Sequence, residues 1–379
     1  MQQLLKNKHL HIVCLDVPFP PDYGGAVDMF YKIKTLHEAG IKIHLHYFCY
    51  NHRGNPNELN GYCETINIYE RKTGHKSFSF ELPYIVASRI NNTLIENLNK
   101  DNYPVLLEGI HCSGIARYLE PGSRKVLIRL HNDESAYYKQ LADAELRFLK
   151  KMYYRNESRL LQKYQQNLPK DCLYAAISEN DVNVFNKQYH LKNTIHLPAF
   201  IPYTQIESQE GIGNFCLYQG NLSVAENDKA ATWLLQKVFS KINIPLVIAG
   251  KKPSEKLQKL IHMYENTCLI ADPSKTEMEE LIQKAQINVI PSFNSSGVKL
   301  KLLQAVFAGR HCIVNEAAVS GSGVEVACHI AANAEAMASI IMQLYRQPFA
   351  EEEILLRKKI LQHNYDNDQN AETIISLLW

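Results

Sequence analysis

The feature of this sequence that most constrains its fold is a regular alternation of short apolar runs with helix-like segments. Each apolar run ends near a glycine, a proline or a polar residue. A stretch with apolar residues three or four positions apart then follows. This rhythm is typical of β-α-β units, in which parallel strands form a sheet that is covered by helices. The chain is therefore predicted to be an α/β protein built on parallel sheets.

The alternation occurs in two halves, separated by a polar segment at 197–214 that contains two prolines. In the first half, strands are expected at Leu10–Leu15, Ile41–Phe48, Val105–Leu107, Val126–Leu130 and Ala175–Ile177, and helices at Val27–Ala39 and Ser135–Gln166. In the second half, strands are expected at Phe215–Tyr218, Leu246–Ala249, Cys268–Ile270, Ile287–Ile290 and Cys312–Val314, and helices at Lys229–Phe239, Leu257–Tyr264 and Met278–Ala285. Two doubly wound domains are predicted, because 379 residues exceed an ordinary single core. Ligands are expected at the carboxyl ends of the strands.

The composition excludes some classes of function. Lys and Arg number 41 against 39 Asp and Glu, so the chain has no bulk positive charge and nucleic-acid binding is not expected. Nine scattered cysteines without a Cys-x-x-Cys pair favour a reducing compartment over a disulfide scaffold. The N-terminus lacks the apolar run of a signal peptide, and no segment offers the roughly 18 apolar residues of a membrane span. A cytoplasmic protein is expected, with peripheral contact to the inner membrane face left open.

The segment SGVKLKLLQAVFAGRHCIVN, Ser296 to Asn315, is the most informative motif. It is predicted to run from a loop through a helix into a buried strand. Gly297 opens it, and Lys299 and Lys301 lie near a helix N-terminus, whose free N–H groups attract an anion, above all a phosphate. Lys301 and Gln304 are three residues apart and share a helix face on which a ligand could lie.

Gly24 and Gly25 follow the first expected strand, where a backbone without side chains lets a ligand approach closely. An ordinary turn in a Pro- and Gly-rich loop is the alternative. Neither a Gly-x-Gly-x-x-Gly fingerprint nor a Gly-x-x-x-x-Gly-Lys-Ser/Thr loop occurs in the chain. Dinucleotide-dependent dehydrogenases and P-loop NTPases are therefore disfavoured.

Three further polar residues follow expected strands. His131 lies in the segment RLHNDE, where it could reach a substrate hydroxyl or carbonyl, or where the segment could simply cap the next helix. Asn221 and Lys251 follow glycines at the ends of two strands of the second half, and Lys251 could bind a phosphate or belong to a solvated turn. One helix-like stretch has a basic surface that suits anionic lipid or simply faces solvent, formed by Arg147, Lys150, Lys151, Arg155, Arg159 and Lys163.

In combination, these motifs resemble those of family 4 of the retaining glycosyltransferases of the GT-B class, over nearly the whole chain. The segment PFPPDYGGA resembles the family's glycine loop, and RLHNDE resembles its strand-end histidine segment. AISENDV, YQGNLSVAEN, IAGKKPS and SSGVKLKLLQAVFAGRHCIV follow in the family's order. The last of these resembles a Gly-Gly-x-Arg-x-Lys-x-x-Glu-Ala pattern of one subgroup.

The resemblance implies two Rossmann-like domains that face each other across a cleft. Residues 1–202 would form the acceptor side, with 351–379 packed back onto it, and residues 203–350 would bind the nucleotide sugar. A UDP- or GDP-sugar is the implied donor, and a hexose (mannose is one candidate) would pass with retention to a glycan or lipid-linked acceptor. No metal or other cofactor is expected, and the leaving diphosphate itself would help to deprotonate the acceptor.

The resemblance also implies roles for individual residues. Lys299 and Lys301 would bind the diphosphate and assist its departure, and His131 would contact the transferred sugar. Gln304 stands where the family has a glutamate that accepts from the ribose hydroxyls. The remaining donor contacts are expected from Gly24, Gly25, Asn221, Lys251, Ser296 and Gly297.

Three substitutions depart from the family pattern. Ser296 and Gln304 replace two glutamates, and Lys299 replaces an arginine. A neutral hydrogen-bond acceptor is worth about 1 kcal/mol against roughly 1.5–3 kcal/mol for a charged one, and lysine lacks arginine's planar fork. Two other functions stay open on these grounds: a nucleotide-sugar epimerase of the same architecture, and a non-catalytic relative that binds a sugar or a protein.

Overall fold

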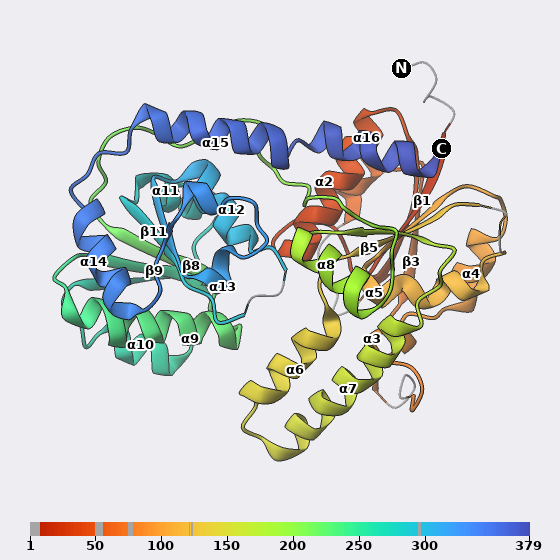
Figure 1. Ribbon diagram of the computed structural model, residues 1–379, viewed down its shortest axis with the longest axis horizontal. Helices are drawn as coiled ribbons and strands as arrows, with labels where there is room; N and C mark the ends of the chain where they lie inside the picture. Colours follow the sequence, from red (N-terminus) through yellow and green to blue (C-terminus); the bar gives the residue numbers. More distant parts are fainter. Residues whose placement is uncertain (1–7, 50–55, 75–78, 121, 123, 295–296) are drawn as a thin grey trace. The chain divides into compact units, whose positions relative to one another are not determined.

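The computed structural model describes residues 8–49, 56–74, 79–120, 122, 124–294 and 297–379. The chain divides into two compact units, Met1–Pro202 with Tyr365–Trp379, and Tyr203–Asn364. Each unit has its own parallel sheet and its own hydrophobic cores (Figure 1). The predicted α/β class with two parallel sheets is confirmed.

In the described part of the first unit, the sheet has the strand order β3-β2-β1-β4-β5-β6-β7, and its registered pairs are parallel. The order reverses between β1 and β4, and ligands of open α/β sheets bind beside the strand ends at such a point. The strands are β1 (His9–Cys14), β2 (Lys42–Cys49), β3 (Thr65–Glu70), β4 (Val105–Glu108), β5 (Val126–Leu130), β6 (Leu173–Ala176) and β7 (Thr194–His196).

Helices cover both faces of this sheet, because its strands are apolar on both sides. One core includes Met29 and Ile33 of α2 with Ile374 of α16, and the other includes Leu161 of α7 and Phe185 of α8. The α-helices are α2 (Gly24–Glu38), α3 (Tyr84–Ala87), α4 (Asn92–Leu98), α5 (Gly109–Cys112), α6 (Glu134–Ala144), α7 (Phe148–Gln166), α8 (Glu179–Gln188) and α16 (Asn367–Leu378), and the 3₁₀ turns are η1 (Pro56–Gly61) and η3 (Ser113–Tyr118).

Two expected helices differ from the sequence prediction. The single helix expected at Ser135–Gln166 is a hairpin of two helices, α6 and α7, because the backbone becomes extended at Glu145. The two helices are joined across the hairpin by hydrogen bonds between Ser135 and Ser158, each hydroxyl donating to the other residue's carbonyl. Helix α2 begins at Gly24, not at Val27, so the two glycines of the predicted loop lie in the first turn of the helix.

The described strands of the second unit have the order β10-β9-β8-β11-β12-β13, again with parallel registered pairs and a reversal, here between β8 and β11. Gly250 permits the close approach of β9 to β8, because an added Cβ would lie 1.9 Å from the Gly220 carbonyl oxygen. The strands are β8 (Cys216–Asn221), β9 (Leu246–Lys251), β10 (Thr267–Ala271), β11 (Ile287–Ile290), β12 (His311–Val314) and β13 (His329–Ile330).

The helices of the second unit follow the predicted alternation. They are α9 (Ala225–Trp233), α10 (Glu255–Ile261), α11 (Lys275–Lys284), α12 (Leu300–Ala308), α13 (Glu316–Val319), α14 (Ala334–Leu344) and α15 (Glu351–Asn364), together with the π-helical turn η4 (Leu234–Val238) and the 3₁₀ turns η5 (Phe239–Lys241) and η6 (Glu325–Ala327). Helix α12 packs by an almost continuous apolar face, in which Leu303 and Phe307 are buried.

The C-terminal segment 351–379, expected to pack on the first domain, is divided between the two units. Helix α15 belongs to the second unit because the buried Arg357 donates to Ser208 Oγ and to the carbonyl oxygens of Gly309 and Arg310. Helix α16 belongs to the first unit, where Asn367 exchanges hydrogen bonds with the backbone of Ile201.

Candidate functional site

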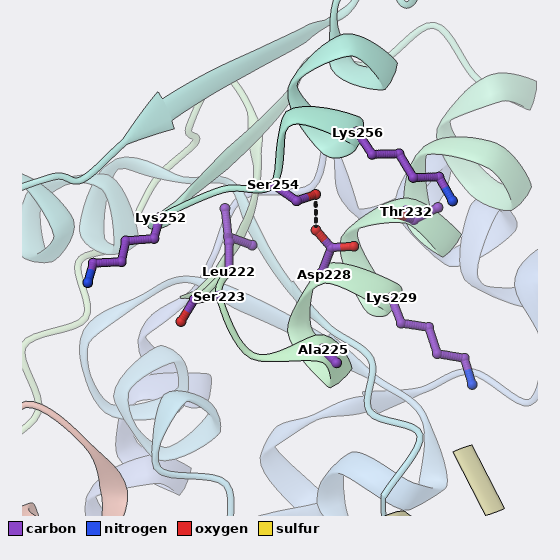
Figure 2. A pocket seen from close by; sticks show the side chains of 9 residues that line it. All are labelled: Leu222, Ser223, Ala225, Asp228, Lys229, Thr232, Lys252, Ser254 and Lys256. Atoms are coloured by element: carbon purple, nitrogen blue, oxygen red, sulfur yellow. Dashed lines mark hydrogen bonds between the residues drawn. The ribbon is translucent and has the colours of Figure 1, made fainter. Parts of the chain in front are cut away.

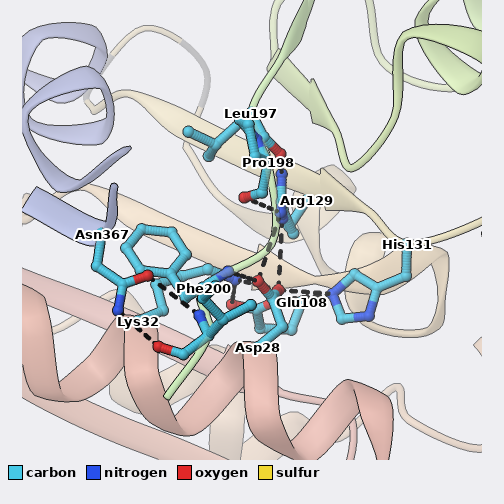
Figure 3. A network of polar contacts seen from close by, with 10 residues as sticks. Asp28, Lys32, Glu108, Arg129, His131, Leu197, Pro198, Phe200 and Asn367 are labelled. Atoms are coloured by element: carbon cyan, nitrogen blue, oxygen red, sulfur yellow. Dashed lines mark hydrogen bonds and ion pairs between the residues drawn. The ribbon is translucent and has the colours of Figure 1, made fainter. Parts of the chain in front are cut away.

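A cluster of buried charges lies at the carboxyl ends of the first unit's strands. The Lys32 ammonium on α2 donates to Asp28 Oδ2 at 2.8 Å and to Glu108 Oε1, the last residue of β4, at 2.7 Å. Arg129 of β5 lies 3.4 Å from Asp28 and also donates to the backbone carbonyls of Leu197 and Pro198 (Figure 3). Two carboxylates therefore balance two cations in a setting from which water is excluded.

His131 is attached to this cluster. Its Nε2 lies 2.8 Å from Glu108 Oε2, and its side chain is 11% exposed, so one edge of the ring reaches solvent. An ionised carboxylate only accepts hydrogen bonds, so Nε2 carries the proton, and in the neutral ring Nδ1 is the acceptor. Gly109, at φ 72°, lets the chain turn directly after Glu108.

The electrostatics keep both carboxyl groups ionised. Burial alone would raise the pKa of Asp28, but the charges of Lys32 and Arg129 outweigh it and hold that pKa well below its usual range. The pKa of Glu108 is lowered in the same way, chiefly by Lys32 against the effect of burial. Asp28, Glu108 and His131 are close enough to hold a metal ion, but Lys32 and Arg129 already neutralise the carboxylates.

Gly24 and Gly25 lie near His131 in the structure. They open α2, whose first N–H groups have no acceptor within the helix, and Asp28, one turn later, lies 3.9 Å from His131 Nε2. A Cβ on Gly25 would lie 3.0 Å from the Tyr23 ring. The first unit thus brings three of the predicted residues to one edge of its sheet.

In the second unit, Lys301 on the first turn of α12 extends toward the carboxyl end of β8. Its ammonium donates to Asn227 Oδ1 at 2.8 Å and lies 5.1 Å from the centre of the Tyr218 ring. Burial lowers the pKa of Lys301 to about 8; Glu226 opposes this shift and Lys299 adds to it. Among the described residues no carboxylate forms an ion pair with this ammonium, and its hydrogen bonds go to the neutral groups Asn227 and Tyr218.

Other predicted donor residues surround Lys301. Gln219 of β8 approaches both the Lys301 carbonyl and Gln304 Oε1, at 3.4 and 3.5 Å. Asn227 donates to the carbonyl of Asn221, which pairs with Lys251 in the register of β8 and β9. The structure therefore gathers four predicted residues, Asn221, Lys251, Lys301 and Gln304, at the carboxyl ends of these strands.

The start of α12 has no side-chain cap. Lys299 is the residue before the helix, and its ammonium donates to the carbonyl of Gly297 at 3.2 Å. Gly297 has φ 65°, a conformation that glycine adopts without strain. Ser296 lies outside the described residues.

A brace of polar contacts holds the loop after β11. Ser292 Oγ donates to Glu226 Oε1 at 2.6 Å, and the backbone of Ser292 exchanges hydrogen bonds of 2.9 and 2.7 Å with the Asn315 side chain. These contacts join the start of α9 to the residues that follow β11 and β12.

A pocket of about 450 Å³ lies beside these strand ends. Three lysines, Lys229, Lys252 and Lys256, are among the residues that line it, and the Ser254 hydroxyl donates to Asp228 within it (Figure 2). None of the predicted site residues lines it, although Leu222 and Lys252 directly follow Asn221 and Lys251. The pocket therefore borders the predicted donor residues without containing them.

Comparison with known proteins decides the family. Residues 213–347 match the family model described as glycosyl transferases group 1. An uncharacterized 44.6 kDa protein in the cps region of Klebsiella pneumoniae is 30% identical, over 78% of this chain and 79% of that protein. The chain belongs to the group 1 glycosyltransferases.

Solved structures agree with this assignment at the level of the fold. TarM superposes with a TM-score of 0.71 at 12% identity, over 98% of this chain and 99% of that one. Sucrose-phosphate synthase from Thermosynechococcus elongatus gives 0.69 at 14% identity, over 98% of each chain. The group 1 glycosyltransferase described here therefore has the GT-B fold. None of its described helices has both the length and the hydrophobicity needed to cross a membrane.

The sequence analysis missed the residues that hold the predicted ones in place. Glu108 is the last residue of an apolar strand, and Asp28 and Lys32 lie within a helix, so only their spatial meeting marks them. Asn227 and Tyr218 contact Lys301 from other elements. The one sequence signal for this group is Glu108, a charged residue at the end of an otherwise apolar strand.

The buried cluster generates a stability prediction. Lys32→Met leaves Glu108 without its ammonium, and breaking a buried pair typically costs about 3–5 kcal/mol. Denaturant unfolding should show a loss of this size. Lys34→Met on the same helix, where the side chain is 38% exposed, should stay within about 0.5 kcal/mol of wild type. Equal stabilities of the two variants would contradict the assignment of Lys32 as the central cation.

Proposed function

We propose that this group 1 glycosyltransferase transfers a hexose, with retention, from a UDP- or GDP-sugar to a glycan or lipid-linked acceptor. The observation that carries the proposal is the Lys301 ammonium, which is buried among neutral partners at the start of α12. A cation that has no ion pair with a carboxylate of the described residues, at the N-terminus of a helix, suits a diphosphate. Lys299, directly before the helix, supplies a second cation. Gly297 has no side chain, so the backbone there leaves room for the ligand.

The residues around Lys301 suit the rest of a nucleotide. Gln304, which meets Gln219, is proposed to accept from a ribose hydroxyl in place of the family's glutamate. Asn221 and Lys251 at the neighbouring strand ends are proposed as further donor contacts. The two family glutamates are replaced, so recognition relies on neutral hydrogen bonds and on the lysines.

On the side of the first unit, His131 is proposed to contact the transferred sugar. Glu108 accepts a hydrogen bond from the Nε2–H group of His131. The Nδ1 atom can then accept a hydrogen bond from a sugar hydroxyl. Gly24 and Gly25 are proposed to approach the diphosphate. In the reaction, the bond from the anomeric carbon to the diphosphate oxygen breaks, the acceptor oxygen bonds to that carbon, and a diphosphate oxygen takes the acceptor's proton. Lys301, Lys299 and the α12 N-terminus stabilise the charge on the leaving group.

The relative in the cps region of Klebsiella pneumoniae supports a role in capsular polysaccharide synthesis. Acceptors of such a pathway would be carried on a membrane lipid, and the α6–α7 hairpin has a matching surface. Around its turn, which lies at the end of the two helices away from the first sheet (Figure 1), large apolar side chains are exposed: Leu146 (97%), Phe148 (72%), Leu149 (82%), Met152 (51%) and Tyr153 (39%). Exposed cations flank them, among them Arg147 and Arg155.

Apolar side chains between cations are the composition of a surface that binds anionic lipid. We propose that the hairpin turn inserts its apolar side chains at the boundary of an anionic bilayer. The cations would attract the head groups while Leu146, Phe148 and Leu149 enter the acyl region.

The donor site is tested by Lys301→Ala. Loss of the ammonium should weaken UDP or GDP binding at least tenfold, about 1.4 kcal/mol, in calorimetry. Lys275→Ala, at an 82% exposed side chain of the same unit, is the matched control and should bind as wild type. A folded Lys301→Ala protein with unchanged affinity would overturn the donor-site assignment.

His131→Ala should reduce turnover with the donor at least tenfold while leaving diphosphate affinity unchanged, because His131 is assigned to the sugar and not to the phosphates. Assays of sugar transfer and donor hydrolysis measure the first quantity and calorimetry the second. A fully active variant would show that the sugar lies elsewhere. Conversion of the donor sugar into its epimer without an acceptor would instead identify an epimerase.

The hairpin is tested by co-sedimentation with vesicles. Wild type should bind phosphatidylglycerol vesicles, bind phosphatidylcholine vesicles much less, and dissociate as salt rises. The triple variant Leu146→Ser, Phe148→Ser, Leu149→Ser should lose binding, and Met263→Ser, at a 76% exposed residue of the second unit, should not. Equal vesicle binding by wild type and triple variant would contradict a lipid contact. So would a wild type that forms a dimer and a triple variant that is a monomer, because the exposed side chains would then bind a second copy of the chain.

A further inference from the structure

Two histidines and a glutamate meet in the second unit, at the amino ends of its strands. His311 is the first residue of β12, His329 is the first residue of β13, and Glu353 lies in the first turn of α15. One potential ligand atom from each residue lies within 4.8 Å of those of the other two. The proposed donor residues Asn221 and Lys251 lie at the opposite, carboxyl ends of strands β8 and β9. The proposed function therefore gives this group no role.

The hydrogen bonds of His311 determine its tautomer. Its Nε2 lies 3.1 Å from the carbonyl oxygen of Gln347, which also accepts from Gln286 Nε2 at 2.6 Å. A carbonyl oxygen only accepts, so His311 Nε2 carries a hydrogen, and the neutral ring presents a lone pair at Nδ1. This residue is 1% exposed, and Nδ1 makes no hydrogen bond to any residue that the structure describes. A buried nitrogen of this kind calls for a partner.

A carboxylate lies beside this nitrogen. Glu353 Oε1 lies 3.4 Å from His311 Nδ1, while Oε2 is 3.3 Å from the Ala350 N–H, which donates to it. A lone pair and a carboxylate oxygen attract each other only through a shared cation or a proton. Two ligand atoms bound at about 2.0–2.1 Å to a tetrahedral zinc ion lie roughly 3.4 Å apart, which matches the observed separation.

His329 completes the set from a half-buried position. Its ring centre lies 5.8 Å from that of His311, at an angle of 63°. The Gln347 carbonyl accepts a hydrogen bond from His311, and the Ala350 N–H donates one to Glu353. Hydrogen bonds of this kind usually orient metal ligands.

We propose that His311, His329 and Glu353 bind one divalent transition-metal cation, with Zn²⁺ as the best fit. Two imidazoles and a carboxylate, with water as the fourth ligand, form a common tetrahedral zinc set. The cation would fasten the start of α15 to β12 and β13. Arg357, one turn after Glu353, moderates the affinity by its charge, and its own donors are engaged with Ser208, Gly309 and Arg310.

The test uses full-length protein without an affinity tag, treated with a chelator and titrated with Zn²⁺ in a calorimeter. Wild type should bind one equivalent and unfold at a higher temperature with Zn²⁺ than without it. Removing a ligand should weaken binding to this site at least tenfold. His329→Ala and Glu353→Gln are preferred to a His311 variant, because both positions are partly exposed and should leave the fold intact.

The matched controls are on α15: Glu352→Gln and His363→Ala, both at exposed positions, should bind as wild type. Co²⁺ gives an independent signal, since a tetrahedral nitrogen and oxygen set produces visible absorption that should vanish in His329→Ala. Absence of zinc binding, or equal binding by ligand and control variants, would overturn the proposal. It would assign the contact to a proton shared by His311 and Glu353. Affinity for UDP or GDP should be the same with and without Zn²⁺, which separates this test from that of the proposed function.

Discussion

The reversal of strand order in each parallel sheet determines where the polar chemistry of this chain lies. Between β1 and β4, and again between β8 and β11, successive connections leave the sheet in opposite directions. The strand ends at these points stay accessible to polar side chains while the rest of each sheet is covered by helices. Glu108, His131, Asn221 and Lys301 all lie at or beside these ends.

The two units treat buried charge differently. In the first, Lys32 and Arg129 balance Asp28 and Glu108, and the cluster orients His131 without a net charge to attract a ligand. In the second, Lys301 is surrounded by the neutral groups Asn227 and Tyr218. A balanced cluster serves to position a side chain, whereas an unbalanced cation serves to bind an anion. This contrast is the physical basis for assigning the diphosphate to the second unit and the sugar contact to His131.

The sequence predicted most of what depends on local pattern. Apolar periodicity predicted the principal strands and the helix α12, and it predicted that His131, Asn221 and Lys251 lie at strand ends, where the structure places them. It placed a single helix where α6 and α7 form a hairpin, because no glycine or proline marks Glu145. The family resemblance implied that residues 351–364 pack on the first domain. They belong to the second unit because Arg357 contacts Gly309 and Arg310, which are far from it in the sequence. The roles of Glu108 and Asn227, and the contact of His311 with Glu353, also join residues far apart in the sequence. Local pattern therefore did not predict them.

The central claim is that Lys301 carries a buried ammonium group whose charge is neutralised by a bound nucleoside diphosphate. Because burial lowers its pKa to about 8, much of it is neutral at a pH of about 8.5, and binding a diphosphate must return the proton. Calorimetry of UDP or GDP binding in buffers of different ionisation enthalpy measures this uptake directly. We expect most of one proton to be taken up by wild type and almost none by Lys301→Arg, whose guanidinium stays charged. Equal proton uptake by the two proteins would contradict the account.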